Sequence, residues 1–245
     1  MKFNASTAQR LALAGLVLAS ASVLALLVAG PGSRFGLWHY HVSFTMMKWA
    51  VYGGLAAAAI SIPAAILCAR RHVAIFPSLV AIALGAAAAW IPWHQLQVAH
   101  SVPPIHDVTT DTAHPPQFVA VVPLRGEGSN PLDYDAKLPA AQKEGYPDLE
   151  PLVLDVPANE AWKRARDAAV SMGWDMVAAD ETAGRIEATD TTFWFGFKDD
   201  VVVRVAADGK GSRIDVRSVS RVGQSDLGAN AARIRKYLAA LRAPA

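Results

Sequence analysis

Three long stretches without a charged side chain occupy the first 93 residues and constrain the fold more than any other feature. They cover residues 11–29, 49–69 and 73–93. A helix of about 20 residues, rising 1.5 Å per residue, crosses a hydrocarbon core of about 30 Å. Apolar runs of this length are too long for ordinary core strands. We therefore predict a transmembrane region over residues 1–93 with three membrane-spanning helices at these positions.

The first apolar run has a second interpretation, a cleaved signal peptide, because Lys2 and Arg10 precede it. A signal core holds about 7–15 apolar residues, fewer than this run, and two further spans follow. The pattern favours a retained span.

Basic residues beside the spans predict the orientation. With the N-terminus in the cytoplasm, four of them fall inside and two outside, and the flank after the third span has none until Arg125. Basic flanks favour the cytoplasmic side. We therefore expect a multi-pass membrane protein with a cytoplasmic N-terminus and a C-terminal domain outside the cytoplasm. The four inside residues are Lys2, Arg10, Arg70 and Arg71, and the two outside are Arg34 and Lys48.

Charge is distributed unevenly along the chain. The first 93 residues hold six basic and no acidic residues, so the remainder holds seventeen basic and twenty-one acidic residues. The basic excess is thus a property of the membrane flanks and does not indicate a nucleic-acid partner. No charge lies within a span, which favours an anchor over a transporter. Gly53, Gly54 and Gly85 predict close helix packing.

The chain beyond the spans predicts an α+β domain. Residues 94–118, rich in Pro, His and Asp, are expected to form a linker, and residues 119–245 the soluble domain. Short turns between the later strands require antiparallel pairing, and two amphipathic helices are most simply buried on one face of the sheet. The predicted strands are 117–124, 152–156, 174–179, 185–191, 201–205 and 213–219, with helices over 161–172 and after Ser225. We expect residues 116–245 to fold without the spans.

Three segments of this region resemble a bacterial and plastid family catalogued as domain of unknown function 1499. They are Pro104–Asp111, Phe195–Arg204 and Ser218–Asn230. The resemblance covers about residues 100–243. It implies a shared fold and an extracytoplasmic or organellar membrane setting, without an established activity.

The predicted linker contains a candidate metal site. His106, Asp107 and Asp111 offer nitrogen and oxygen ligands to a divalent cation. The spacing matches no tight ligand motif, so the competing interpretation is a polar segment held by local Asp and Thr hydrogen bonds.

The last predicted strand places basic side chains on one face, because side chains alternate along a strand. Arg213, Arg217 and Arg221 share that face with Asp215, and Arg204 and Arg185 can join it from neighbouring strands. Such a face attracts a phosphate or carboxylate headgroup, as in an anionic lipid. The alternative is a solvated face neutralised by Asp215 and Glu187.

An aromatic segment precedes Lys198. Phe193, Trp194, Phe195 and Phe197 surround Gly196. An aromatic turn can enter a membrane interface or line an apolar ligand site. The alternative is core packing beneath the helices, since Phe193, Phe195 and Phe197 would share a strand face.

We expect a membrane-tethered binding or accessory domain that recognises a lipid, an envelope glycan or a partner protein. No cofactor is predicted. The candidate ligand-binding residues include two from the third resembling segment, Asp226 and Asn230. The alternative role of Asp226, together with Ser225, is to cap the last helix. The alternative function is an envelope enzyme using His106, Asp107 and Asp226 or a bound metal.

Overall fold

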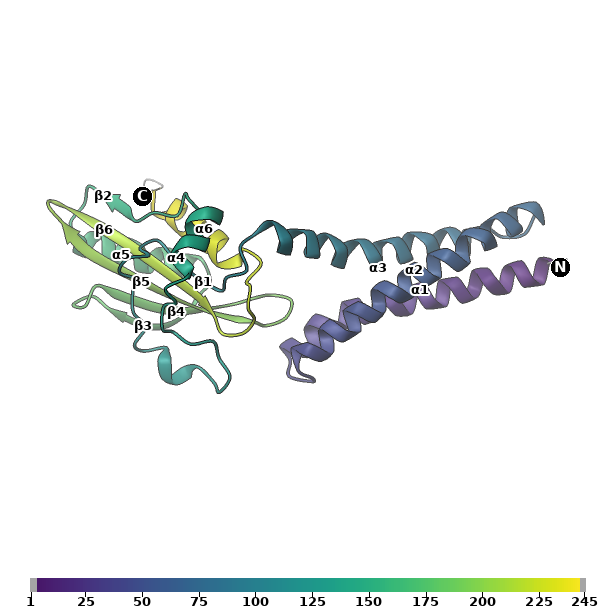
Figure 1. The fold of residues 1–245 in the computed structure, drawn as a ribbon, viewed down its shortest axis with the longest axis horizontal. Coiled ribbons are helices and arrows are strands. Elements are labelled where there is room, and N and C mark those ends of the chain that lie inside the picture. The colour runs from purple at the N-terminus through teal and green to yellow at the C-terminus, as the bar shows by residue number, and fades with distance from the viewer. Residues whose placement is uncertain (1–3, 243–245) are drawn as a thin grey trace. The chain divides into compact units, whose positions relative to one another are not determined.

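The computed structural model describes residues 4–242, which form two compact units (Figure 1). The first unit comprises the chain up to Val98 together with Phe193–Gly196. The second comprises Ala99–Thr192 and the chain from Phe197 onward. Lys2, which contributes to the predicted orientation, lies outside the described residues.

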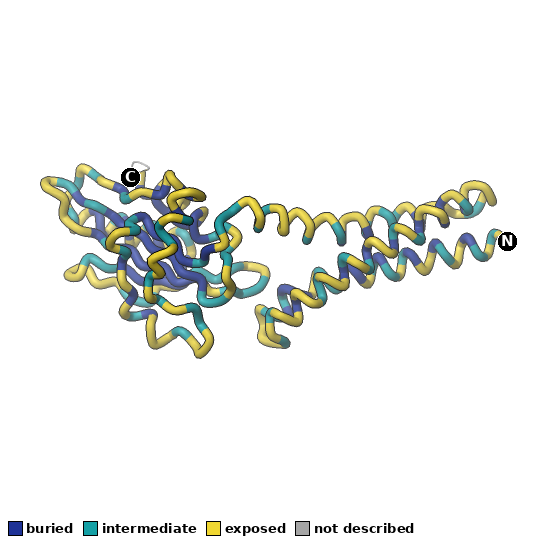
Figure 2. Tube along the Cα trace, in the orientation of Figure 1, coloured by how far each residue is buried: buried dark blue, intermediate teal, exposed yellow. Residues whose placement is uncertain are grey.

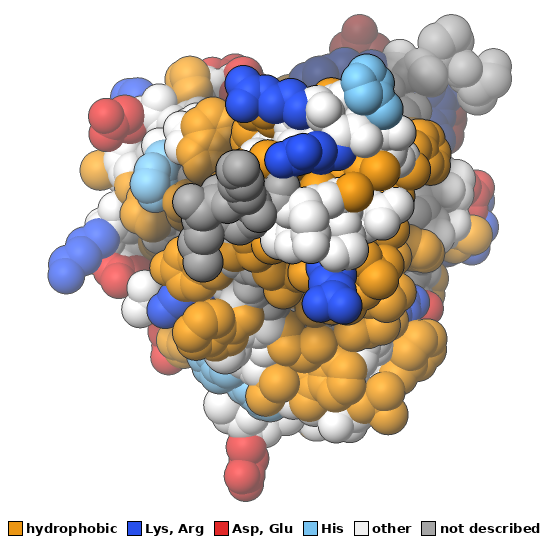
Figure 3. All heavy atoms as spheres, turned by 90° about the vertical axis from the view of Figure 1, so that its right-hand side faces the viewer, with side chains coloured by type: hydrophobic (Ala, Val, Ile, Leu, Met, Phe, Trp, Pro, Cys, Tyr) orange, Lys and Arg blue, Asp and Glu red, His pale blue; other side chains and the backbone are white. Residues whose placement is uncertain are grey.

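Three helices build the first unit, and all three predicted spans are confirmed. They are α1 (Ala5–Arg34), α2 (Tyr40–Arg70) and α3 (Phe76–Ser101), each long and apolar enough to cross a membrane. Hydrophobic side chains, interspersed with single basic ones, cover the end of this unit that carries the N-terminus (Figure 3). Helices α1 and α2 extend beyond both ends of their predicted spans, whereas α3 begins at Phe76 and continues eight residues past Trp93 into the expected linker.

Small residues line the contacts between these helices. Gly54 of α2 and Gly85 of α3 approach so closely that a Cβ on either would meet the other's backbone carbonyl. A Cβ on Gly15 would likewise meet the Ser61 hydroxyl across the α1–α2 contact. Close backbone approach through glycine and alanine is the usual way in which helices associate in lipid, where no hydrophobic driving force acts between them.

The second unit is built on an antiparallel sheet, as predicted. Its order is β1-β6-β5-β4-β3, and β2 pairs with the same edge of β6 as β1 does. β1 lies opposite residues 217–219 and β2 opposite residues 212–214, so the two short strands together cover one edge. The strands are β1 (Asp107–Thr109), β2 (Leu152–Leu154), β3 (Asp175–Asp180), β4 (Arg185–Thr191), β5 (Lys198–Asp208) and β6 (Gly211–Ser220).

One face of this sheet carries the main core. Helices α5 (Ala158–Ser171) and α6 (Ala229–Arg242) pack their apolar stripes on it, as expected for two amphipathic helices. Alternate strand residues supply the other half of the core, and these strands form the buried centre of the unit in Figure 2. The sheet side chains in this core include Ile186, Ala188, Val201, Val203, Val205, Ile214 and Val216.

A segment without strands covers the opposite face. We call residues 110–134 the strap. Phe118 and Val121 of the strap pack on Val202 and Val219 of the sheet. The predicted strand over 117–124 is wrong: the strap contains only a 3-10 turn at Val122–Leu124, and a short helix α4 (Leu138–Gly145) follows it. The backbone amides of strap residues 119–121 donate to the side chain of Glu187 in the sheet and not to a neighbouring strand.

The expected linker over 94–118 is also corrected. Its first residues continue α3 to Ser101, its centre forms β1, and its last residues begin the strap. A connection of five residues, 102–106, remains between α3 and the sheet, and we call it the tether. Polar composition suggested a solvated linker, but the Asp and Thr side chains here are buried partners of the sheet.

This architecture changes the expectation for isolated fragments. We predict that residues 99–245 unfold cooperatively on their own, whereas residues 116–245 do not. The shorter fragment lacks β1 and therefore Asp107, the carboxylate that neutralises the buried Arg217. Removing one partner of a buried ion pair costs about 3–5 kcal/mol. Urea unfolding followed by circular dichroism checks this, and a cooperative transition in the 116–245 fragment would contradict it.

Candidate functional site

Arg217, the centre of the predicted basic face, is fully buried. Both oxygens of Asp107 accept hydrogen bonds from its guanidinium, at 3.0 and 2.7 Å. The carbonyl of Leu132 accepts another at 2.7 Å. The rings of Phe118 and Tyr134 lie 5.4 and 5.3 Å from its central carbon. Burial, together with the charge of Asp107, raises the pKa of Tyr134 to about 12.

The neighbouring arginines are also paired with carboxylates. Arg221 donates to both oxygens of Asp200, at 2.8–3.2 Å. Arg204 and Arg213 converge on Asp215, at 2.8 and 3.0 Å, and both also reach Asp111. The strap covers this face.

The predicted headgroup site on this face is therefore corrected. Arg217 has no exposed surface, and only 13% of the Arg221 side chain is exposed. Arg204 and Arg213 pair with Asp215 and keep 35% and 40% of their side chains exposed, which matches the alternative of a solvated, neutralised face. Alternation along the strand correctly placed the arginines on one face, yet it carries no information about a distant segment that packs over them.

The three candidate metal ligands do not form a cluster. Asp107 binds Arg217, and Asp111 binds Arg204 and Arg213. Among residues 4–242, no group of three or more His, Cys, Asp or Glu side chains is arranged to hold a metal ion. The backbone carbonyl of His106 accepts hydrogen bonds from Ser220 N and Asn230 Nδ2.

Glu187 fixes the strap at its middle. Its buried carboxylate accepts from the amides of Val119, Ala120 and Val121, at 2.9–3.1 Å. Arg185 donates to the same carboxylate at 3.0 Å. Hydrogen bonds from amides to a carboxylate are stronger than those between neutral groups. Glu187 is thus a structural partner of the strap, a role that its place in a strand does not disclose.

Asp226 and Asn230 organise the start of α6. The Asp226 carboxylate accepts from the amides of Gly228 and Asn230, both at 2.8 Å. Burial raises the pKa of Asp226 above its ordinary value despite these donors. Asn230, which has no exposed surface, accepts from the Ser218 hydroxyl at 2.7 Å and donates to the Ser220 hydroxyl at 3.0 Å.

Arg233 extends this polar network across the sheet. It donates to Asp199 at 2.6 Å and to Asp190 at 2.7 Å. It also contacts the Ser218 hydroxyl at 3.1 Å. Arg233 belongs to none of the candidate motifs of the sequence. The sequence feature that could have indicated its burial is its position one helical turn after Asn230. It shares that side of α6 with the buried Ile234 and Tyr237.

The aromatic segment forms the turn between β4 and β5 rather than a strand. Phe197 N donates to the Thr192 hydroxyl at 2.9 Å, Thr192 N donates to the Phe197 carbonyl at 2.8 Å, and Gly196 adopts a left-handed φ of 71°. The side chain of Phe193 is 85% exposed and that of Trp194 39%. Core packing of Phe193 is therefore ruled out. Lys198, at the start of β5, is also exposed.

Within the first unit, the same aromatics contact the ends of two helices. Arg34, the last residue of α1, donates to the Phe193 carbonyl at 2.8 Å. The rings of Phe44 and Phe195 meet edge to face at 5.5 Å between centroids. Gly30 leaves space for the Trp194 indole, which a Cβ at that position would overlap.

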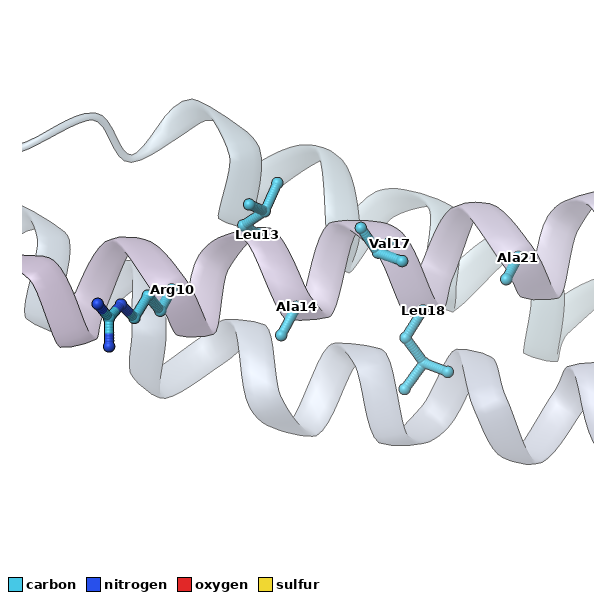
Figure 4. Close-up of a pocket in the computed structure, with 6 residues that line it drawn as sticks. All are labelled: Arg10, Leu13, Ala14, Val17, Leu18 and Ala21. Atoms are coloured by element: carbon cyan, nitrogen blue, oxygen red, sulfur yellow. The ribbon is translucent and has the colours of Figure 1, made fainter.

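Two hollows lie on the surface of the described residues. Figure 4 shows one along α1, lined by the aliphatic side chains of Leu13, Val17 and Leu18 with Arg10 at its end. It lies on a span, where lipid chains fill such a surface. The other, of about 270 Å³, lies beside the first turn of α5 and is lined in part by Trp162. The Trp162 indole Nε1 has no hydrogen-bond partner among the described residues.

Comparison with known proteins identifies the class to which this fold belongs. Residues 107–241 match the family described as "Protein of unknown function (DUF1499)". The chain belongs to the DUF1499 family, as its three motifs suggested. The match begins at the first residue of β1, so the family unit includes the strand that binds Arg217. No curated protein matches the chain.

We predict that Glu187→Gln loosens the strap. The amide side chain keeps one acceptor oxygen but loses the charge, and hydrogen bonds to a charged group contribute about 1.5–3 kcal/mol. We expect the free energy of unfolding to fall by about 2 kcal/mol and the amides of residues 119–121 to exchange hydrogen faster. Hydrogen exchange with mass spectrometry measures this, with the exposed Glu181→Gln as the control. Unchanged exchange in the strap would show that Glu187 does not hold it.

The lowered pKa of Asp111 makes the free energy of unfolding depend on pH. Burial raises its pKa, but amide hydrogen bonds from His114 and Ala113 and the charges of Arg213 and Arg204 outweigh this, leaving it below the ordinary 3.8. A lowered folded-state pKa contributes stability that is present above the unfolded value and lost as pH falls through the folded pKa.

We therefore expect Asp111→Asn to lower the free energy of unfolding by a constant amount between about pH 7 and 5. The difference from the native chain should shrink as the pH falls below 3.8. Urea titrations across this range measure it, with the exposed Asp133→Asn as the matched control. A difference that stays constant down to the lowest pH would exclude the proposed role of the Asp111 charge.

Proposed function

We propose that this chain is a membrane-tethered binding or accessory domain that recognises a lipid, an envelope glycan or a partner protein at the membrane surface. The observation that carries the proposal is the five-residue tether between Ser101 of α3 and Asp107 of β1. An extended chain spans at most about 3.6 Å per residue, so the sheet stays within about 20 Å of the end of α3.

The tether is itself fixed at its sheet end. Ile105 is buried in the main core, and its carbonyl accepts from Asp226 N at 3.0 Å. Asp107 follows and pairs with Arg217. A domain held in this way meets membrane lipids, surface glycans and other membrane proteins at high effective concentration.

The distribution of basic residues supports an extracytoplasmic position in a bacterial inner membrane. Arg10 and the Arg70–Arg71 turn flank the spans on the predicted cytoplasmic side, with Lys2 outside the described residues. Arg34 and Lys48 lie on the other side. Basic residues concentrate in short cytoplasmic loops.

Binding accounts for the candidate residues better than catalysis does. The alternative, an envelope enzyme, needs reactive groups at His106, Asp107 and Asp226. Both oxygens of Asp107 accept from Arg217, and those of Asp226 accept from the amides of Gly228 and Asn230. These bonds hold the fold of the described residues together.

Reporter fusions test the orientation. We expect alkaline phosphatase fused after Ala245 to be active, because it gains activity only outside the cytoplasm, and a fluorescent protein that folds only in the cytoplasm to stay dark there. A fusion in the Arg70–Arg71 turn should give the reverse result. Fluorescence of the C-terminal fusion would place the domain in the cytoplasm.

Native mass spectrometry of gently extracted full-length chain tests the binding. We expect a copurifying lipid, glycan or protein that dissociates when residues 99–245 are removed by truncation at Val98. The truncated chain is the control for molecules held only by the spans. Identical copurifying molecules in both chains would contradict a binding role of the domain.

A further inference from the structure

We propose that the turn of residues 192–197 is an interfacial anchor, which inserts Phe193 and Trp194 into the headgroup region of the bilayer crossed by α1–α3. This inference rests on the proposed tethering. It assigns a partner, the lipid surface, to Phe193 and Trp194, which are 85% and 39% exposed.

The strand register places this turn at the end of the sheet where the tether enters. Asp107, the first residue of β1, lies opposite Val219 near the end of β6. Ser220 of β6 lies opposite Asp199 of β5, and Asp199 lies opposite Asp190 of β4. The first residue of β1, the last of β6 and the β4–β5 turn therefore share one end, which we call the tether end.

The turn is built to present its aromatics. Its two ends are joined by the paired hydrogen bonds between Thr192 and Phe197. Phe193 stands 85% exposed at this tip. A large aromatic side chain held in water by a closed turn indicates a surface for contact.

The chemistry of the tip matches a membrane interface. Trp places an apolar ring and one N–H donor together, and such rings concentrate at the headgroup level of bilayers. Lys198 follows at the start of β5 and is exposed, and juxtamembrane cations are attracted to anionic headgroups. Leu227, 43% exposed, lies in the loop after β6 at the same tether end.

Contacts inside the first unit agree with this assignment. Arg34 ends α1 and donates to the Phe193 carbonyl. The 30 residues of α1 exceed the length that a hydrocarbon core requires, so its last residue falls in the headgroup layer. A turn that meets Arg34 is therefore at interfacial depth.

Site-specific fluorescence in nanodiscs tests the proposal on the full chain. Phe193→Cys, in a Cys68→Ser background, carries an environment-sensitive dye in a disc of phosphatidylcholine with a minority of phosphatidylglycerol. Cys68 is the single native cysteine, so its replacement leaves one labelling site. The exposed position 193 tolerates the label without a change in packing.

Lys210→Cys in the same background is the matched control, because the exposed Lys210 lies in the β5–β6 turn at the opposite end of the sheet. We expect blue-shifted emission from position 193, quenched by lipids that carry a nitroxide near the headgroup. Emission from position 210 should instead be quenched by aqueous iodide.

Quenching by iodide alone at position 193 would overturn the proposal. Shielding from both quenchers would overturn it as well, in favour of a protein contact. The result does not depend on which side of the membrane the domain occupies. A failure here is therefore distinct from a failure of the predicted orientation.

Discussion

The ion pair between Arg217 and Asp107 is the interaction on which the rest of the second unit depends. A guanidinium without exposed surface is tolerated only when its charge and its donors are satisfied. Asp107 provides the charge, and the carbonyls of Pro116 and Leu132 accept from it as well. One side chain of β6 thus joins β1 to both halves of the strap.

This pair also connects the membrane region to the fold of the domain. Five residues separate the end of α3 from Asp107, the first residue of β1, so the chain enters the sheet directly after the third helix. Other carboxylates on the strap-facing side of the sheet are also paired with hydrogen-bond donors. Glu187 binds backbone amides of the strap, while Asp200 and Asp215 bind arginines. The polar face of the sheet is therefore an internal interface.

The opposite face has a different physical basis. There the apolar stripes of α5 and α6 meet alternate strand residues, and a cluster of polar groups surrounds Asn230 and Arg233. These groups lie at the tether end, next to the aromatic turn. Hydrogen bonds of Asn230 and Arg233 hold this end of the sheet together. Phe193 and Trp194 are exposed on the surface beside them.

Local sequence signals determined the three long apolar helices, strands β2–β6 and the two helices on one face, whereas β1 lay in the expected linker and the strand expected over 117–124 does not form. These signals are uncharged runs, alternation and helical spacing. The strap left no such signal, because its amides bond to Glu187, which is distant in sequence. No local sequence signal identified the partners of Arg217, Asp111 and Asp226 either. Tertiary structure decided these partners, because the sequence pattern around a charged side chain is the same whether the side chain faces water or a buried opposite charge.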